Sequence, residues 1–140
     1  MNEPMLNEDQ ILILMREGFP GWDETGVVIE SVAMKACRLR LAIDARFLRH
    51  GGTVSGPTQF FLADTALFIA TLASVGPKSL AVTTNVSINF LRKPAPRDLT
   101  ADCRLLKLGS RLAVGEVLIF SDGEEDPVAH ATGTYSIPAR

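Results

Sequence analysis

The sequence predicts an α+β fold, built from a strand pair, one long apolar helix and then an antiparallel meander. The first observation is a run over residues 57–75 that contains a single charge, Asp64. The second is the half of the chain after this run, which alternates between strand-like segments and turn signals. The third is the size of the chain, 140 residues with 46% hydrophobic and 21% charged residues, which suits one domain with a sizeable core. We therefore expect a single domain over residues 1–140, with residues 1–20 as an N-terminal helix and lead-in.

The segment before the long helix begins with a capping signal. Asn7 is a good N-cap, and Gln10 three residues later completes a capping-box pattern before the apolar residues 11–15. The Gly-Phe-Pro-Gly sequence at 18–21 ends that helix. The elements expected next are strands at 27–32 and 35–44 and a loop at 46–53.

The long helix has clear start and stop signals. Gly56 can supply an unusual backbone angle, Pro57 suits the first helical position, and Gly76 followed by a proline ends the helix. A helix that is apolar nearly all round is buried. Because a single sheet covers only one side of a helix, we expect a second copy of the chain to cover the rest. The predicted assembly is a homodimer, with a homotetramer as the alternative.

The second half of the chain predicts strand after strand. Residues 81–91 alternate between apolar and polar side chains, and Gly109-Ser110 is a tight hairpin signal. A polar turn follows at 121–127. The other strands expected here are 98–108, 111–120 and 128–137.

Bulk properties exclude several partners. The net charge of −2 gives no footprint for nucleic acid, and the apolar residues 11–15 are too few for a signal sequence or a membrane span. Cys37 and Cys103 lie in strand-like patterns without metal-type spacing, so we expect buried free thiols and a reducing compartment. The predicted location is cytoplasmic, with no membrane partner.

Asp64 is the first candidate for chemistry. Its neighbours three and four positions away are Phe60, Phe61, Leu67 and Phe68, so its carboxylate is expected among large apolar groups. Burying an unpaired carboxylate is costly. The structural alternative is an aspartate that accepts hydrogen bonds from a Thr or Ser across a helix interface.

Four motifs together resemble one known family. They are Gly52-Thr53-Val54-Ser55-Gly56-Pro57 with Asp64 nine positions after Ser55, the strand Val82-Thr83 to Leu91-Arg92-Lys93-Pro94, the hairpin at 107–111 and the closing segment 128–135. Their order and spacing resemble the hotdog-fold acyl-CoA thioesterases, specifically the PaaI-like branch of the phenylacetate pathway. The resemblance covers roughly residues 25–137.

The resemblance implies a hotdog fold, in which an antiparallel sheet wraps around one long buried helix, and the hydrolysis of an acyl-CoA to a free acid and CoA. Asp64 would act on water as a base or attack the thioester as a nucleophile, and the Gly56 N–H would polarise the carbonyl from across a dimer interface. Thr83 would hold the water. The residues expected to contact the substrate are Ser55, Arg49, His50, Pro57, Phe60, Arg92 and Lys93, with Arg97 as a further phosphate contact. No metal is expected, and no cofactor, since coenzyme A is part of the substrate.

The chain departs from the family pattern at two positions, and other functions compete. Ser55 stands where the family has a histidine and Pro57 where it has a second glycine, so Ser55 is expected to cap the helix. These losses favour a non-catalytic acyl-CoA-binding hotdog protein as the alternative. A hotdog dehydratase ranks last because it needs a histidine at that place. The acyl group stays open, since Phe60, Phe61 and Phe68 suit either a pocket or the core.

Overall fold

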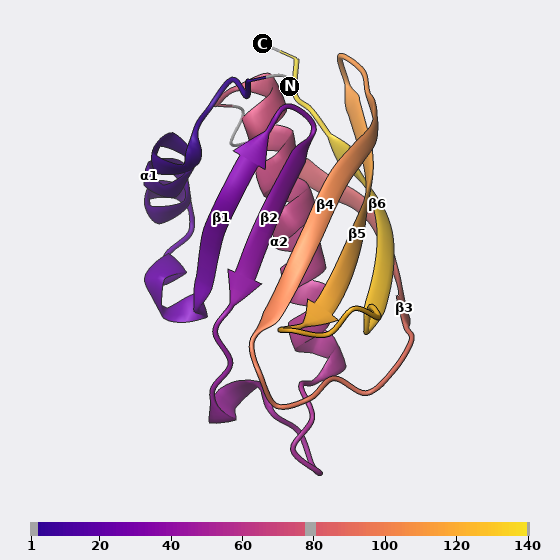
Figure 1. Cartoon of the computed structure of the whole chain (residues 1–140). Coiled ribbons are helices and arrows are strands. Elements are labelled where there is room, and N and C mark those ends of the chain that lie inside the picture. The colour runs from indigo at the N-terminus through magenta and orange to yellow at the C-terminus, as the bar shows by residue number, and fades with distance from the viewer. Residues whose placement is uncertain (1–2, 78–80, 140) are drawn as a thin grey trace.

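A six-stranded antiparallel sheet forms one layer of the molecule, and the long helix α2 (Gly56–Val75) lies across one face of it (Figure 1). In this computed structural model, residues 3–77 and 81–139 are described, so the ends of the predicted domain (1–2 and 140) and residues 78–80 lie outside. The strand order is β1-β2-β4-β5-β6-β3. The strands are β1 (Val27–Ala33), β2 (Ala36–Leu41), β3 (Val82–Phe90), β4 (Leu99–Leu108), β5 (Leu112–Ser121) and β6 (Ala129–Ser136). The predicted α+β class and hotdog fold are confirmed.

The predicted meander is correct only for β4, β5 and β6, which pair in sequence order. Strand β3 pairs instead with β6, while β4 pairs with β2. The connection after β3 therefore crosses the lower end of the sheet, as Figure 1 shows. Its two prolines, Pro94 and Pro96, cannot donate ladder hydrogen bonds and so break the strand pattern there. This crossing makes β3 an edge strand.

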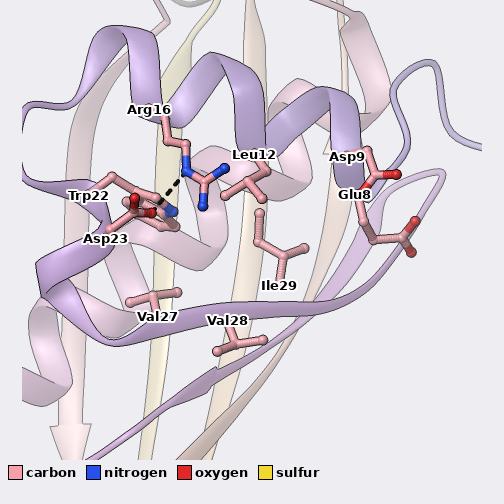
Figure 2. A pocket seen from close by; sticks show the side chains of 9 residues that line it. All are labelled: Glu8, Asp9, Leu12, Arg16, Trp22, Asp23, Val27, Val28 and Ile29. Carbon is pink, nitrogen blue, oxygen red and sulfur yellow. Dashed lines mark hydrogen bonds and ion pairs between the residues drawn. The ribbon is translucent and has the colours of Figure 1, made fainter.

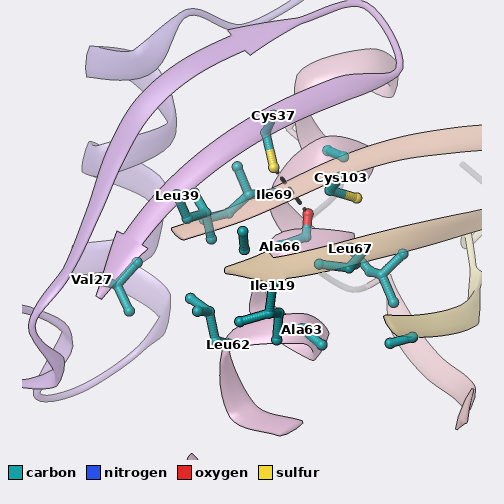
Figure 3. Close-up of a cluster of buried hydrophobic side chains, with 14 of the residues drawn as sticks. Val27, Cys37, Leu39, Leu62, Ala63, Ala66, Leu67, Ile69, Cys103 and Ile119 are labelled. Atoms are coloured by element: carbon teal, nitrogen blue, oxygen red, sulfur yellow. Dashed lines mark hydrogen bonds between the residues drawn. The ribbon is translucent and has the colours of Figure 1, made fainter. Parts of the chain in front are cut away.

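The core lies between the inner face of the sheet and α2. Figure 3 shows Leu39 and Ile119 from the strands close to Leu62 and Ile69 from the helix, and all four side chains are 0% exposed. By length and composition α2 could cross a membrane, but 67% of its most apolar window is buried in this core. Burial against the sheet thus accounts for the apolar character of α2.

Two glycines on neighbouring strands receive one leucine of the helix. Gly115 of β5 and Gly133 of β6 are directly paired. A Cβ at Gly133 would lie 2.6 Å from Leu67 Cδ1, and one at Gly115 would lie 2.9 Å from Leu67 Cδ2. The pair therefore forms a hollow that lets α2 approach the sheet closely at Leu67.

The two cysteines are buried and free, as predicted. Cys37 and Cys103 face each other across β2 and β4, and the Cys37 thiol donates to the Ala66 carbonyl over 3.3 Å (Figure 3). The neighbouring Cys103 thiol and burial hold the pKa of Cys37 well above its usual range.

Helix α1 (Glu8–Gly18) lies beside the β1 edge of the sheet (Figure 1). The predicted capping box of Asn7 and Gln10 is present. Glu8 accepts the Val32 N–H over 3.1 Å, and Figure 2 shows Leu12 of α1 facing Ile29 of β1. The side chain of Glu8 thus accepts a backbone N–H on the outer edge of β1, where the described residues form no further strand.

Three predicted boundaries need correction. The strand expected at 35–44 begins at Ala36, because Lys35 adopts a left-handed turn (φ 66°). It ends at Leu41, and Asp44 caps a short 3₁₀ turn at Ala45–Phe47 that begins before the expected loop and continues into it. Gly56, not Pro57, is the first helical residue, and its φ is not positive. The alternation predicted in β3 is interrupted by a register shift between Thr83 and Asn85.

Candidate active site

Asp64 lies at the middle of α2, half-buried, and faces the edge formed by β6 and β3. The Tyr135 hydroxyl of β6 donates to Asp64 Oδ1 over 2.6 Å, and the Thr83 hydroxyl of β3 donates to the same oxygen over 2.9 Å. Tyr135 also approaches the Asp64 backbone carbonyl at 3.1 Å. The expectation of an unpaired carboxylate is therefore wrong, and Thr83 binds the carboxylate directly.

The two oxygens of this carboxylate are not equivalent. Oδ1 receives both hydrogen bonds, whereas Oδ2 accepts none from the residues that the structure describes. Charge-assisted bonds of this length are strong and fix the carboxylate in the plane that they define. Oδ2 is consequently held in place with lone pairs available for a water or a substrate.

Sequence reasoning missed Tyr135. Burial, together with the hydrogen bond to Asp64, raises the pKa of Tyr135 above its ordinary value, so this hydroxyl stays protonated and keeps donating. Tyr135 lies 71 residues after Asp64, and only the placement of β6 beside α2 brings them together. The one available signal was that Tyr135 is the only tyrosine of the chain, on a strand that closes the sheet.

Gly56 begins α2 behind Ser55, whose side chain accepts the Thr58 N–H and caps the helix as predicted. No acceptor among the described residues takes the Gly56 N–H. Two constraints favour a glycine at position 56. The first is that a helical residue directly before Pro57 is sterically disfavoured if it carries a Cβ. A Cβ there would also lie 3.3 Å from Phe90 Cζ. The start of α2 thus offers a free donor at the positive end of the helix dipole.

A groove of about 680 Å³ opens beside this donor. It brings together five of the predicted substrate contacts and Gly56, namely Arg49, His50, Pro57, Arg92 and Lys93. No acidic residue lines it, and none of its Arg or Lys side chains forms an ion pair with the described part of the chain. The groove is therefore positively charged and open at the helix start.

Three predicted contacts lie elsewhere. Phe60 is 39% exposed on α2 and does not line this groove. Ser55 is half-buried with its hydroxyl 2.8 Å from the Thr58 hydroxyl. Arg97 does not line the groove, and it donates to the Asp122 carbonyl and pairs with Glu124 instead.

Gly56 and Asp64 of one chain lie too far apart to act on one bond. Eight residues of α-helix span about 12 Å. A carbonyl donor and a base that acts through one water need to converge on the same carbonyl group within hydrogen-bond reach. Within residues 3–77 and 81–139, no group of three or more His, Cys, Asp or Glu side chains is arranged to hold a metal ion.

Comparison with known proteins matches this chain to a family and to several similar proteins and solved structures. A family model described as the thioesterase superfamily matches residues 51–128. A crystal structure of a proposed thioesterase from Silicibacter sp. TM1040 is 46% identical, with a TM-score of 0.89 over 98% of this chain and 95% of that one. A proposed esterase of Halobacterium salinarum is 30% identical over 123 residues, 80% of each chain. A mutant of the phenylacetic acid degradation protein PaaI from Thermus thermophilus is 25% identical, with a TM-score of 0.74 over 85% of this chain and 99% of that one.

Proposed function

Because this chain belongs to the thioesterase superfamily and is a thioester hydrolase, we propose that it hydrolyses an acyl-CoA and that Asp64 is its base or nucleophile. The observation that carries this proposal is the carboxylate itself, held by Tyr135 and Thr83 through one oxygen while the other is unpaired. An open carboxylate oxygen on a half-buried side chain can reach a water or a substrate, which is what a base or nucleophile requires.

As a general base, Asp64 Oδ2 takes a proton from water as the oxygen of that water bonds to the thioester carbon. The carbonyl oxygen becomes an oxyanion, which the Gly56 N–H stabilises at the positive end of α2. The tetrahedral intermediate then breaks its C–S bond, and Asp64 returns the proton to the leaving thiolate. As a nucleophile, Oδ2 would bond to the thioester carbon, and the C–S bond would break with CoA leaving as the thiolate. Water would then cleave the mixed anhydride, which restores the Asp64 carboxylate and releases the free acid and a proton for the thiolate. Both routes give a free acid and CoA.

The donor and the base come from different protomers in this proposal. The separation of about 12 Å within one helix supports it, because one chain cannot present both groups to one thioester. The edge strand β3 supports it as well, since it carries Thr83 and has exposed apolar side chains at Val82 (58%) and Phe90 (53%). A homodimer that pairs along this edge would cover those side chains and bring α2 of each chain near the other.

The positive groove beside Gly56 is the proposed site for the phosphates of coenzyme A. Arg49, Arg92 and Lys93 supply charge there without an acidic neighbour, and His50 is exposed beside them. Phosphate groups are bound well by such unpaired cations near a helix start. The thioester of a bound CoA ester would then lie close to the Gly56 donor.

The test is thiol release from short-, medium- and long-chain and aromatic acyl-CoAs by wild type and Asp64→Asn. The asparagine keeps the size and an oxygen that Tyr135 and Thr83 can bond, so it isolates the loss of the base. We expect wild-type turnover that falls about 10²-fold or more in the variant. Wild-type protein that binds CoA esters but releases no thiol would instead support the non-catalytic binder, which the losses at Ser55 and Pro57 favour.

A further inference from the structure

A small apolar pocket lies between α1 and α2, on the face of α2 that carries Asp64. Its volume is about 190 Å³, and it is lined by Leu14, Met15, Gly18, Phe19, Phe68 and Leu72. None of these side chains is polar, so the pocket offers nothing to a phosphate or an amide. Its position and its chemistry separate it from the positive groove beside Gly56.

The aromatic walls of this pocket contact the neighbours of Asp64 on both sides. Phe68 follows Asp64 by one helical turn, and its ring centroid lies 5.8 Å from that of Tyr135, which bonds the carboxylate. Phe19 packs edge-on against Phe61, one turn before Asp64, at 6.4 Å between centroids. Along α2, the pocket therefore begins at Phe68, four residues or about 6 Å from Asp64, and extends to Leu72, eight residues or about 12 Å from it.

We propose that this pocket binds the acyl group of the thioester and that α1 sets the largest acyl group accepted. The inference rests on the proposed function. The acyl half of the substrate would lie in the protomer that supplies Asp64, and the CoA half in the groove of the protomer that supplies Gly56.

The volume of the pocket defines the substrate class. An engineered apolar cavity of about 150 Å³ binds benzene. A pocket of about 190 Å³ therefore holds a compact apolar group of about six to eight carbons. Each methylene buried there raises kcat/KM about fourfold, and each one that does not fit gains nothing. The enzyme is then selective for medium-length or ring-containing acyl groups and against long chains.

Helix α1 lies outside the part of the chain that the family model matches. The family match begins at residue 51, after α1 has ended. Four of the six lining residues belong to α1 or follow it directly. The N-terminal segment therefore supplies most of the pocket wall, and Phe68 and Leu72 of the matched part supply the rest.

Gly18 is the position at which the pocket is narrowed. A Cβ at Gly18 would meet no heavy atom within 4 Å, and its φ is not positive, so the backbone accepts a side chain there and Gly18→Leu adds four carbons at the pocket wall. Leu14→Ala removes side-chain volume from another wall residue and should enlarge the pocket. Glu17→Leu is the matched control, because it adds a leucine at an exposed position of the same helix end that does not line the pocket.

The experiment measures kcat/KM for straight-chain acyl-CoAs from butanoyl to dodecanoyl with wild type and the three variants. We expect a wild-type optimum at about six to eight carbons. Gly18→Leu should lower kcat/KM for octanoyl-CoA by about tenfold or more while butanoyl-CoA changes less than about threefold, and Leu14→Ala should move the optimum to longer chains. Glu17→Leu should keep the wild-type profile.

Two outcomes would overturn the inference, and they can be told apart. Wild-type activity with a chain-length profile that is the same in Gly18→Leu and Glu17→Leu would remove the pocket from substrate binding and leave the thioesterase proposal standing. No hydrolysis of any acyl-CoA by the folded wild type would remove the proposed function, and the acyl pocket with it.

Discussion

The donor role of Gly56 is tested by removing its N–H while the helix start is kept. Proline at the first helical position lacks only a hydrogen that has no partner inside the helix. Ser55 already has φ −69° and ψ 156°, the extended conformation that a residue before proline prefers. A proline directly before Pro57 would strain the helix, so the change is made in a Pro57→Ala background. Gly56→Pro in that background then removes one donor and little else.

The expected loss follows from the geometry of the donor. Removing one oxyanion donor typically costs a factor of about 10²–10³ in kcat, or about 2.7–4 kcal/mol. The control is Gly56→Ala in the same background, which keeps the N–H and places a Cβ 3.3 Å from Phe90 Cζ. Because Phe90 is 53% exposed, its ring can move aside. The control should therefore lose less than about tenfold.

The assay is steady-state thiol release with kcat and KM determined separately, and the midpoint of thermal unfolding shows that both variants are folded. We expect the proline variant to lose kcat with little change in KM, since the donor acts on the developing oxyanion. A proline variant within about threefold of the alanine control in kcat would refute the assignment of the Gly56 N–H.

Three further predictions concern the fold and its titration. Tyr135 is the only tyrosine, and its raised pKa means that the native chain keeps this proton at a pH of about 10, where the unfolded chain loses it. The free energy of unfolding should thus be at its full value below that pH and fall as the pH rises above it. Tyrosinate absorbance should appear only as the protein unfolds. A Tyr135 hydroxyl that titrates near pH 10 in the native chain would contradict this. Gly133→Ala should destabilise the chain by about 1–3 kcal/mol in denaturant unfolding, because its Cβ would lie 2.6 Å from Leu67 Cδ1. The double variant with Leu67→Val should recover part of this loss. A single variant with an unchanged free energy of unfolding would show that Leu67 does not fill the hollow tightly. Both cysteines should resist a thiol reagent near pH 8 until denaturant is added, and fast reaction of either in the native chain would disprove their burial.

The parts of the fold that depend on local signals could be predicted from the sequence. The capping box at Asn7 and the cap at Ser55 involve residues three apart, and both are present. The strands follow from alternation, which is also local. The pairing of β3 with β6 could not be predicted this way, because the choice of partner depends on the route of the connection through Pro94 and Pro96.

The candidate site, too, has parts that local signals predict and parts that depend on the tertiary fold. Asp64 and Gly56 stand out through a charge in an apolar helix and a turn motif, and the groove gathers cations that the resemblance had suggested. The hydroxyl of Tyr135 could not be assigned, because its contact with Asp64 exists only once β6 is placed beside α2. The same contact overturned the expectation of an unpaired carboxylate. Tyr135 and Thr83 both donate to Oδ1 of Asp64, and this leaves Oδ2 available.

The central claim is that one active site uses Asp64 of one protomer and Gly56 of its partner, and mixed dimers test it most directly. Asp64→Asn and the Gly56→Pro variant, each nearly inactive alone, are co-expressed with different affinity tags, and dimers carrying both tags are purified. In such a mixed dimer one site combines both defects and the other has neither. The account predicts about half of the wild-type rate per dimer, or about a quarter from random mixing without purification. Mixed dimers that are as inactive as either parent would contradict a shared site.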